Sequence, residues 1–331
     1  MHLNALQVLL LSLTLSACQT TAIKPIETKS NPLLHAYDFH IINTQSQQQI
    51  TIDQLAEQLS SYDVVFIGEF HGNHASHLLE TLLLAKLYQL RPEQQLSLEM
   101  FNRDQQTALN RYLDGEIGEV ALVRKTPTWN NYIAGYRPVV EFAKQNFIPV
   151  IAANASADIV RCIGREGKAY LDKLSEDEQQ YIAQAPFIDN TLYREKYLSV
   201  MEDSKHLTDE SKERSYLAQL TRDNTMAESI SHAYEEAPET QIIHLNGSFH
   251  SEASLGTVSA LKTRQPKLKV AVITPIAVED PSQPSYLDKD LQSGDFIYLI
   301  QSQPEQYQDA AYRQEIMQAM FKRASTATCK P

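Results

Sequence analysis

The sequence predicts an α/β fold, a mostly parallel sheet flanked by helices with a helical insertion or lid, and two observations predict it. Six short apolar runs, each bounded by polar residues, are aliphatic on both faces, as is typical of strands buried on both sides of a parallel sheet. Helical patterns lie between these runs, and such alternation favours parallel crossover connections. The runs are Val64–Ile67, Leu96–Leu98, Ile148–Ala152, Ile242–Leu245, Val270–Ile273 and Phe296–Ile300.

The segments between the runs carry helix signals. Leucines recur at helical spacing across Leu78–Leu87, directly after the first run. Ser175 and Glu178 stand three apart, a capping-box pattern that opens a helix. The segment Lys212–Glu236 has the pattern of a long amphipathic helix. Because the stretch between the third and fourth runs is mostly helical, polar and rich in Tyr, we expect residues 160–235 to form an insertion over the sheet.

The N-terminus predicts a lipoprotein signal peptide at residues 1–17. The stretch from residue 3 to residue 15 is largely apolar, has the length of a signal-peptide core and is short for a transmembrane helix. Leu15-Ser16-Ala17-Cys18 then has the small-residue pattern of a lipobox. We therefore expect cleavage before Cys18, lipidation of its thiol, palmitate among the acyl chains, and stable membrane anchoring by more than one chain.

The residues that flank this segment bear on which membrane holds the protein and on whether the signal is that of a lipoprotein. Gln19 follows the cysteine, and the lack of Asp there favours the outer membrane, with the protein facing the periplasm or the cell surface. An ordinary secretory signal with an incidental cysteine is the alternative, because the first residues contain no Lys or Arg. Beyond this segment we expect a tether at 18–40, an α/β domain at 41–305 and a C-terminal helix or tail at 306–331.

Charge and cysteine content restrict the function further. The formal net charge is −12 and the isoelectric point is about 5.3, which argues against nucleic acid as a partner. Apart from Cys18, the sequence holds Cys162 and Cys329. They could pair in an oxidising compartment, although the sequence leaves open whether they meet.

Polar residues follow the predicted strands. Glu69 and His71 come after the first, Glu99 after the second and His250 after the fourth. The pattern Gly-x-x-His thus occurs twice, at 68–71 and 247–250. Because ligands of open parallel sheets bind beyond the carboxyl ends of the strands, we expect these four side chains to converge.

Histidine and carboxylate can hold a divalent metal or transfer protons near neutral pH. The four residues are therefore candidate metal ligands, with no catalytic role assigned to any one of them. Capping of helix N-termini is the alternative for a single motif, although two matched motifs favour a real site. His77, a few residues into the next helix, is expected to lie on a solvated face.

Several motifs in order resemble the ChaN-like haem-binding lipoproteins of the Tiki/TraB/erythromycin-esterase superfamily. They are Gly68-Glu69-Phe70-His71, Leu98-Glu99-Met100-Phe101, the run Trp129/Tyr132/Tyr136-Arg137-Pro138, Val150-Ile151-Ala152-Ala153-Asn154, Arg222-Asp223 with Met226-Ala227-Glu228, and Asn246-Gly247-Ser248-Phe249-His250. The resemblance spans about residues 45–300. It implies a homodimer in haem and iron uptake that holds non-covalent b-type haem at the dimer interface, through a tyrosine phenolate with a histidine of the other subunit nearby, and an outer-membrane haem transporter as a partner.

The resemblance does not fix the iron-binding residue among 16 tyrosines. The candidates are Tyr132, Tyr136, Tyr193 and Tyr197. His206 is the candidate histidine near the phenolate, with His74 in reserve. Arginine matches carboxylate in a bidentate manner, so Arg137, Arg161 and Arg194 are candidates for the haem propionates, with surface arginines as the alternative reading.

Two functions therefore remain open. The first is sequestration of ferric haem on a membrane through a phenolate, which favours ferric iron. The second is a metal-dependent or general-base hydrolase that uses Glu69, His71, Glu99 and His250, because the superfamily includes peptidases and an esterase. The absence of a Gly-x-Ser-x-Gly motif counts against a serine hydrolase.

Overall fold

The computed structural model describes residues 26–27, 31–126, 129–202, 207–326 and 328–330. The predicted signal peptide at 1–17, the lipidation at Cys18 and the candidate His206 lie outside the described residues. Among the helices that are described, none is long and apolar enough to cross a membrane.

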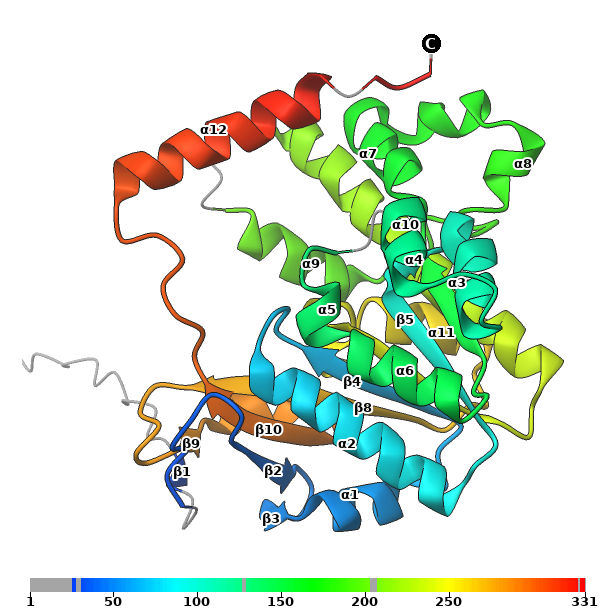
Figure 1. Cartoon of the computed structure of the whole chain (residues 1–331). Helices are drawn as coiled ribbons and strands as arrows, with labels where there is room; N and C mark the ends of the chain where they lie inside the picture. The colour runs from blue at the N-terminus through cyan, green and yellow to red at the C-terminus, as the bar shows by residue number, and fades with distance from the viewer. Residues whose placement is uncertain (1–25, 28–30, 127–128, 203–206, 327, 331) are drawn as a thin grey trace, which may run out of the picture.

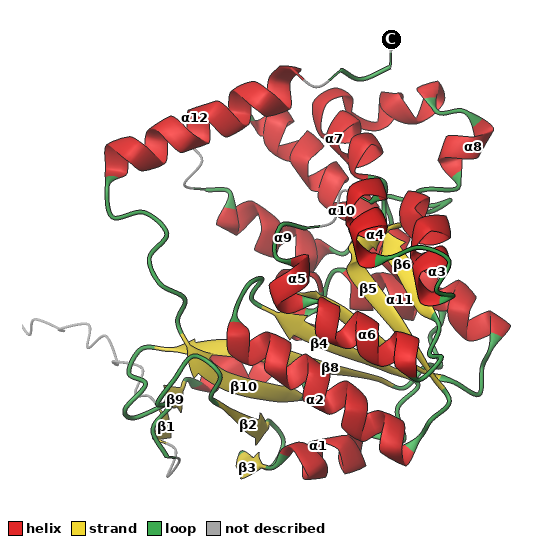
Figure 2. Cartoon of the chain, viewed as in Figure 1, coloured by secondary structure: helices red, strands yellow, loops and turns green. Residues whose placement is uncertain are grey.

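An eight-stranded sheet forms the centre of the molecule (Figures 1 and 2). Its order is β3-β2-β10-β8-β4-β7-β5-β6, and the six strands from β10 to β6 run parallel. These six correspond to the six predicted strands, so the predicted fold class is confirmed. Their bounds are β4 Val64–Glu69, β5 Gln94–Asn102, β6 Val150–Asn154, β7 Gln241–Gly247, β8 Val270–Val278 and β10 Phe296–Gln301.

Two antiparallel strands extend the sheet at one edge. β2 (Phe39–Asn43) pairs with β10, and β3 (Gln48–Ile50) pairs with β2. Leu33, inside the expected tether, is buried in a cluster that includes Leu299 of β10. The folded domain therefore begins before residue 41. The sequence around Leu33 is polar and contains Pro32, and it carries no periodic pattern that would predict this packing. A separate pair consists of β1 (Ile26–Glu27) and β9 (Ser285–Tyr286).

Helices cover both faces of the sheet (Figure 1). α1 (Ile52–Leu59), α2 (His74–Leu90) and α6 (Arg137–Gln145) pack their apolar residues on one face. The other face is covered by α10 (Asp209–Glu236) and α11 (Thr257–Arg264). Shorter helices are α3 Gln106–Leu113, α4 Glu119–Lys125, α5 Tyr132–Gly135, and the 3-10 turns η1 Arg103–Gln105, η3 Ser248–His250, η4 Glu252–Ser254 and η5 Asp288–Gln292.

The expected insertion is only partly a lid. Ala227 and Ile230 in the second half of α10 pack against Val64 and Phe66 of the sheet. This half is therefore the crossover helix that precedes β7, and a parallel connection requires such a helix. The remaining helices form a layer with its own small cores. They are α7 Ala157–Glu166, η2 Gly167–Lys173, α8 Glu176–Gln179, which opens with the expected capping box, and α9 Thr191–Val200.

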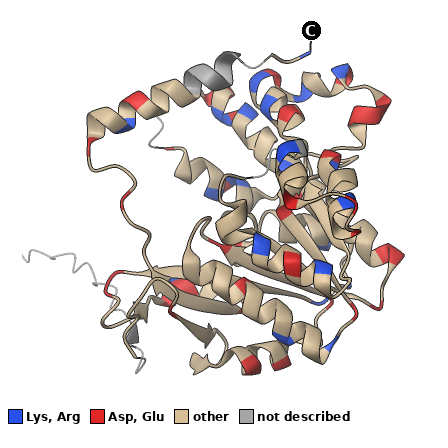
Figure 3. Cartoon of the chain, in the orientation of Figure 1, with Lys and Arg blue, Asp and Glu red and all other residues tan. Residues whose placement is uncertain are grey.

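The C-terminal segment returns to this helical layer. Helix α12 (Ala310–Thr326) lies in the expected C-terminal region, and Figure 1 shows it next to α7 and above α9, away from the sheet. Cys162 of α7 and Cys329 form a disulfide, which answers the question that the sequence left open. Charged residues lie mainly on helices and loops, and the strands carry few of them (Figure 3).

Candidate functional site at the carboxyl edge of the sheet

The four predicted strand-end residues lie at the ends of three adjacent strands or directly after them. β7 runs between β4 and β5, so Glu69 at the end of β4 stands beside Gly247 at the end of β7. Glu99 lies on β5, and His250 lies in η3 directly after β7. The structure thus brings Glu69, His71, Glu99 and His250 to one edge of the sheet, as parallel strands about 4.8 Å apart require.

Gly247 joins the two halves of this site. A Cβ atom at residue 247 would lie 2.5 Å from Nε2 of His71, so the imidazole occupies the space that a side chain would fill. On the other side, the Gly247 amide donates to Oε2 of Glu99 at 2.7 Å. Glycine is therefore required at residue 247 because the His71 ring approaches its backbone closely. A side chain there would push the His71 ring away from the second motif.

The first half is a histidine held by a carboxylate. Oε1 of Glu69 contacts Nδ1 of His71 at 2.5 Å and accepts the Tyr136 hydroxyl at 2.6 Å. The ring of Trp129 packs edge-on against the imidazole. Glu69 is buried, whereas the His71 side chain is 40% exposed. Burial alone would lower the pKa of His71, but the hydrogen bond to Glu69 and the nearby Glu99 raise it above its ordinary value.

The second half is a histidine enclosed by two carboxylates. Nδ1 of His250 lies 2.7 Å from Oδ1 of Asp223, and Nε2 lies 3.4 Å from Oε1 of Glu99. Burial opposes charge on both partners, yet Glu99 and Asp223 raise the pKa of His250 to about 10. His250 in turn lowers the pKa of Glu99 to about 2. The pair is therefore fully ionised at neutral pH, and charged His250 cannot accept a proton as a general base.

Asp223 is a site residue that sequence reasoning did not assign. It lies on α10, is buried, and accepts hydrogen bonds from the Tyr193 and Thr257 hydroxyls as well as contacting His250. Its only sequence signal was its place in the Arg222-Asp223 motif. A helix residue that reaches a strand end from the opposite layer follows no local spacing, so only packing reveals the contact.

His77 is not on a solvated face, contrary to expectation. Its side chain is buried, and Nδ1 lies 3.1 Å from Oε2 of Glu69 and 3.0 Å from Oε2 of Glu80. Burial lowers the pKa of His77, and burial together with the Glu69 carboxylate raises the pKa of Glu80 well above its ordinary value. The prediction failed because the first turn of α2 faces inward beneath the strand-end loop.

The tyrosine candidates differ in accessibility. Tyr132, Tyr136 and Tyr193 are buried. The hydroxyls of Tyr136 and Tyr193 donate to the carboxylates of Glu69 and Asp223, and burial raises the pKa of all three phenols. Tyr197 is half-buried, and its hydroxyl shares a 2.6 Å hydrogen bond with Ser215. The reserve histidine, His74, is exposed and stacks on Tyr37.

The three arginine candidates all make ion pairs. Arg137 pairs with Glu119, Arg194 with Glu213, and Arg161 with Asp158 one turn earlier in α7. Of these three, Arg161 also lines a cavity together with Tyr197.

Two adjoining cavities lie in the helical layer. One of about 320 Å³ is lined by Tyr197, Arg161 and Arg222, among others. Another of about 950 Å³ shares Gly164 and Ser215 with it and extends to α12. Its further lining residues include Met201, Leu207, Met317, Arg214 and Arg313.

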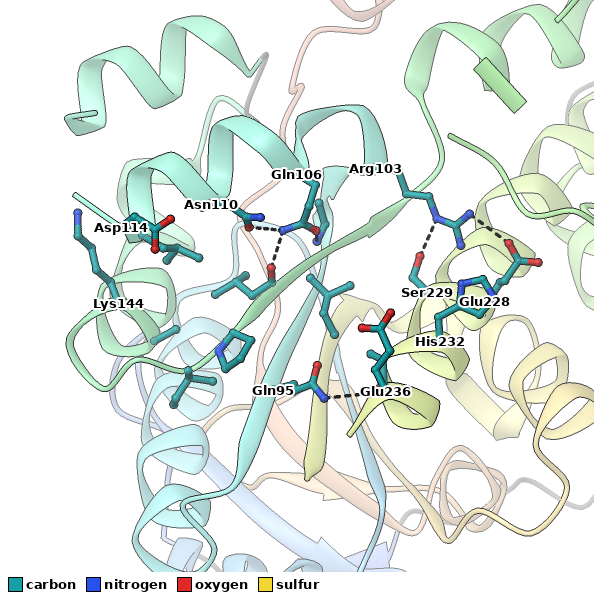
Figure 4. A pocket seen from close by; sticks show the side chains of 18 of the residues that line it. Gln95, Arg103, Gln106, Asn110, Asp114, Lys144, Glu228, Ser229, His232 and Glu236 are labelled. Atoms are coloured by element: carbon teal, nitrogen blue, oxygen red, sulfur yellow. Dashed lines mark hydrogen bonds and ion pairs between the residues drawn. The ribbon is translucent and has the colours of Figure 1, made fainter. Parts of the chain in front are cut away.

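A third cavity, about 1060 Å³ in volume, lies elsewhere, beside the edge strand β6 (Figure 4). Several of its polar side chains already have partners within the protein. Arg103 pairs with Glu228, while Gln106 accepts the Ala152 amide and donates to the Val150 carbonyl, closing the strand edge. It contains none of the strand-end residues.

The fold and the site define an α/β protein with a histidine–carboxylate cluster at the carboxyl ends of its central strands. A family model described as haem-binding uptake, Tiki superfamily, ChaN matches residues 55–261, and the chain belongs to this family. Haem binding and uptake are thus the activity of its family, and the resemblance seen in the sequence is confirmed. No curated protein matches the chain.

One of the solved structures that the chain resembles shares its fold. This structure, of ChaN from Campylobacter jejuni with cofacial haem binding, has a TM-score of 0.59 and 18% identity, and the match covers 82% of this chain and 100% of that one. More distant likenesses are an erythromycin esterase in its open conformation (TM-score 0.44, 13% identity, 76% and 83% covered) and a type III effector (TM-score 0.42, 14% identity, 87% and 100% covered).

Proposed function

We propose that this protein is a membrane-anchored lipoprotein that takes part in haem or iron uptake and holds ferric b-type haem non-covalently through Tyr197. Membership of the haem-binding uptake family supports the ligand. One observation carries the choice of residue: of the four candidate tyrosines, Tyr197 is the one that is half-buried and lines a cavity. A phenolate is a hard anionic donor that favours ferric iron, and reduction of the iron therefore promotes release.

The surroundings of Tyr197 suit a porphyrin. Met201, Leu207 and Met317 supply apolar surface to the larger adjoining cavity, and Arg214 and Arg313 supply cations for propionates. Burial raises the pKa of Tyr197, so the phenol is neutral without a ligand. The iron must displace its proton, which makes haem binding release a proton and strengthen as the pH rises.

A second copy of the chain would complete the pocket. One axial tyrosine leaves the opposite face of the porphyrin to water unless another surface covers it. Large apolar side chains are exposed near the cavities, with Val200 on α9 64% exposed and Met320 on α12 60% exposed. We assign this surface to a homodimer contact, with His206 of the second copy beside the phenolate and His74 in reserve. Delivery or removal of haem would fall to an outer-membrane transporter.

The test is titration of the full chain with haemin. Wild type should bind saturably with the spectrum of high-spin ferric tyrosinate, and Tyr197→Phe should lose that signature while staying folded. Tyr132→Phe, Tyr136→Phe and Tyr193→Phe are the matched controls and should keep it. If one of these three loses the signature instead, or if Tyr197→Phe keeps it, the assignment of Tyr197 fails.

Anchoring has an independent test. Cys18→Ser should abolish incorporation of a labelled fatty acid and release the protein from the membrane fraction, since the cysteine of the lipobox is the acylation site. Label retained on the variant would contradict lipidation at Cys18.

A hydrolase remains the second candidate function because of one observation. The His71 imidazole is 40% exposed, and its Nδ1 is held by buried Glu69, an arrangement that orients a base toward substrate. Turnover of ester or peptide substrates that disappears in His71→Asn and persists in Tyr197→Phe would establish it. Absence of turnover in the presence of added Zn²⁺ or Mn²⁺ would exclude it for those substrates.

A further inference from the structure

We propose that Glu69, His77 and Glu80 form a buried site for one divalent transition-metal ion, beneath the strand-end residues. The three residues come from β4 and from the first two turns of α2. One ligand atom from each lies within 4.8 Å of the others, and all three side chains are buried. This site differs from the Glu69, His71, Glu99 and His250 set that the sequence suggested, and it shares only Glu69 with it.

The spacing of the three ligand atoms matches metal coordination. Nδ1 of His77 lies 3.1 Å from Oε2 of Glu69 and 3.0 Å from Oε2 of Glu80. Metal–ligand bonds of roughly 2.0–2.1 Å in a tetrahedral site place neighbouring ligand atoms roughly 3.3 Å apart. A small relaxation outward would therefore admit an ion between them.

The hydrogen bonding inside the cluster is incomplete. Oε2 of Glu69, Oε1 of Glu80 and Nε2 of His77 are buried and make no hydrogen bond among the described residues, which leaves Oε2 of Glu69 with only its ion-pair contact to His77. Buried carboxylate oxygens without partners are costly, and native proteins rarely keep several of them together without a reason. An ion bound by Oε2 of Glu69 would give that oxygen its partner.

Charge balance points the same way. Glu69 makes ion pairs with His71 and His77, and Glu80 makes one with His77, so among the described residues neither carboxylate is paired with a Lys or Arg side chain. Burial and Glu69 favour a proton on Glu80 when no ion is bound. A divalent cation would displace that proton and balance both carboxylates while leaving His77 neutral, as a metal ligand must be. Imidazole with carboxylates suits zinc and its first-row neighbours better than Ca²⁺, which prefers oxygen alone.

The packing of His77 holds its ligand atom in place. A Cβ atom at Gly135 of α5 would lie 2.7 Å from Nε2 of His77, so the ring is wedged against the backbone there. Its Nδ1, on the other side of the ring, faces the two carboxylates. Because Oε1 of Glu69 meanwhile holds His71 and Tyr136, a metal on Oε2 would fix the carboxylate that orients the exposed histidine.

The experiment uses the untagged full chain, stripped of metal and titrated with Co²⁺ and Zn²⁺. We expect one equivalent of Co²⁺ to give the visible absorption of a low-symmetry nitrogen–oxygen site, and Zn²⁺ to displace it. His77→Asn and the isosteric Glu80→Gln should lose this signal. His74→Asn, an exposed histidine in the same helix turn, and Tyr197→Phe should retain it, which separates the metal site from haem binding.

Three outcomes would overturn the proposal. The first is wild-type protein that binds neither ion saturably. The second is loss of the signal in His250→Asn together with its retention in Glu80→Gln, which would move the metal to the strand-end residues. The third applies if the variants fail to fold: an anomalous-scattering peak in crystals of Co²⁺-loaded wild type located away from the three ligand atoms.

Discussion

The two Gly-x-x-His motifs are alike in sequence and differ in the structure. His71 contacts one carboxylate and its side chain is 40% exposed, whereas His250 lies between Glu99 and Asp223 and its side chain is 9% exposed. His250 is therefore a buried, charged residue. His71 is accessible to solvent, and buried Glu69 holds its ring in place through Nδ1. The difference shows that the motif places an imidazole at a strand end, while the surrounding carboxylates and burial decide what that imidazole does.

The largest effect should come from His250→Asn. The substitution leaves two buried carboxylates without their cation, and breaking a buried pair of this kind costs about 3–5 kcal/mol. Urea unfolding followed by circular dichroism measures the change in unfolding free energy. A loss below about 1 kcal/mol would mean that the second motif is as loosely held as the first.

Substitution of the glycine that joins the two motifs should have an intermediate effect. Gly247→Ala places a Cβ atom 2.5 Å from Nε2 of His71 and should cost about 1–3 kcal/mol by overpacking. Gly164→Ala in α7 is the matched control, because its Cβ atom meets only Ala218 at 3.5 Å. That change should be neutral or slightly stabilising in a helix. Equal effects of the two substitutions would argue against a close approach of His71.

The smallest stability effect should come from His71→Asn. Its side chain is partly exposed and its removal leaves Tyr136 to bond Glu69, so we expect a loss of about 1 kcal/mol or less in the same unfolding assay. A loss equal to that of His250→Asn would contradict the difference in burial and charge between the two histidines.

The pH dependence of stability tests the charge of the buried histidine without any substitution. The folded pKa of His250, about 10, lies above the ordinary 6.5, so its stabilising charge is fully present below about pH 6.5 and is lost as the pH rises through 10. The folded pKa of Glu99, about 2, lies below the ordinary 4.5, so its contribution is present above about pH 4.5 and is lost as the pH falls through 2. The pair should thus stabilise the protein most between about pH 4.5 and 6.5.

Imidazole resonances in NMR spectra measure this directly. His250 should titrate well above His71, and Asp223→Asn should lower the pKa of His250 and leave that of His71 nearly unchanged, because Asp223 contacts only the second histidine. Coincident titration of the two histidines in wild type would contradict the electrostatic contrast.

The sequence by itself determined the central part of the fold and predicted that four strand-end residues lie close together. Buried parallel strands are apolar on both faces over a few residues, so all six could be recognised locally, and Glu69, His71, Glu99 and His250 follow from the rule that strand ends share one edge. The antiparallel strands Phe39–Asn43 and Gln48–Ile50 escaped prediction because they mix polar and apolar residues without a clear period.

Only the tertiary structure decided how the site is completed. Asp223 and His77 reach it from helices on opposite faces of the sheet, and Tyr136 and Tyr193 turn out to be buried donors to its carboxylates. Contacts of this kind join residues from separate elements, so no local spacing encodes them. Protonation and accessibility depend in turn on the full shell of neighbours around each group, which exists only after the layers have packed.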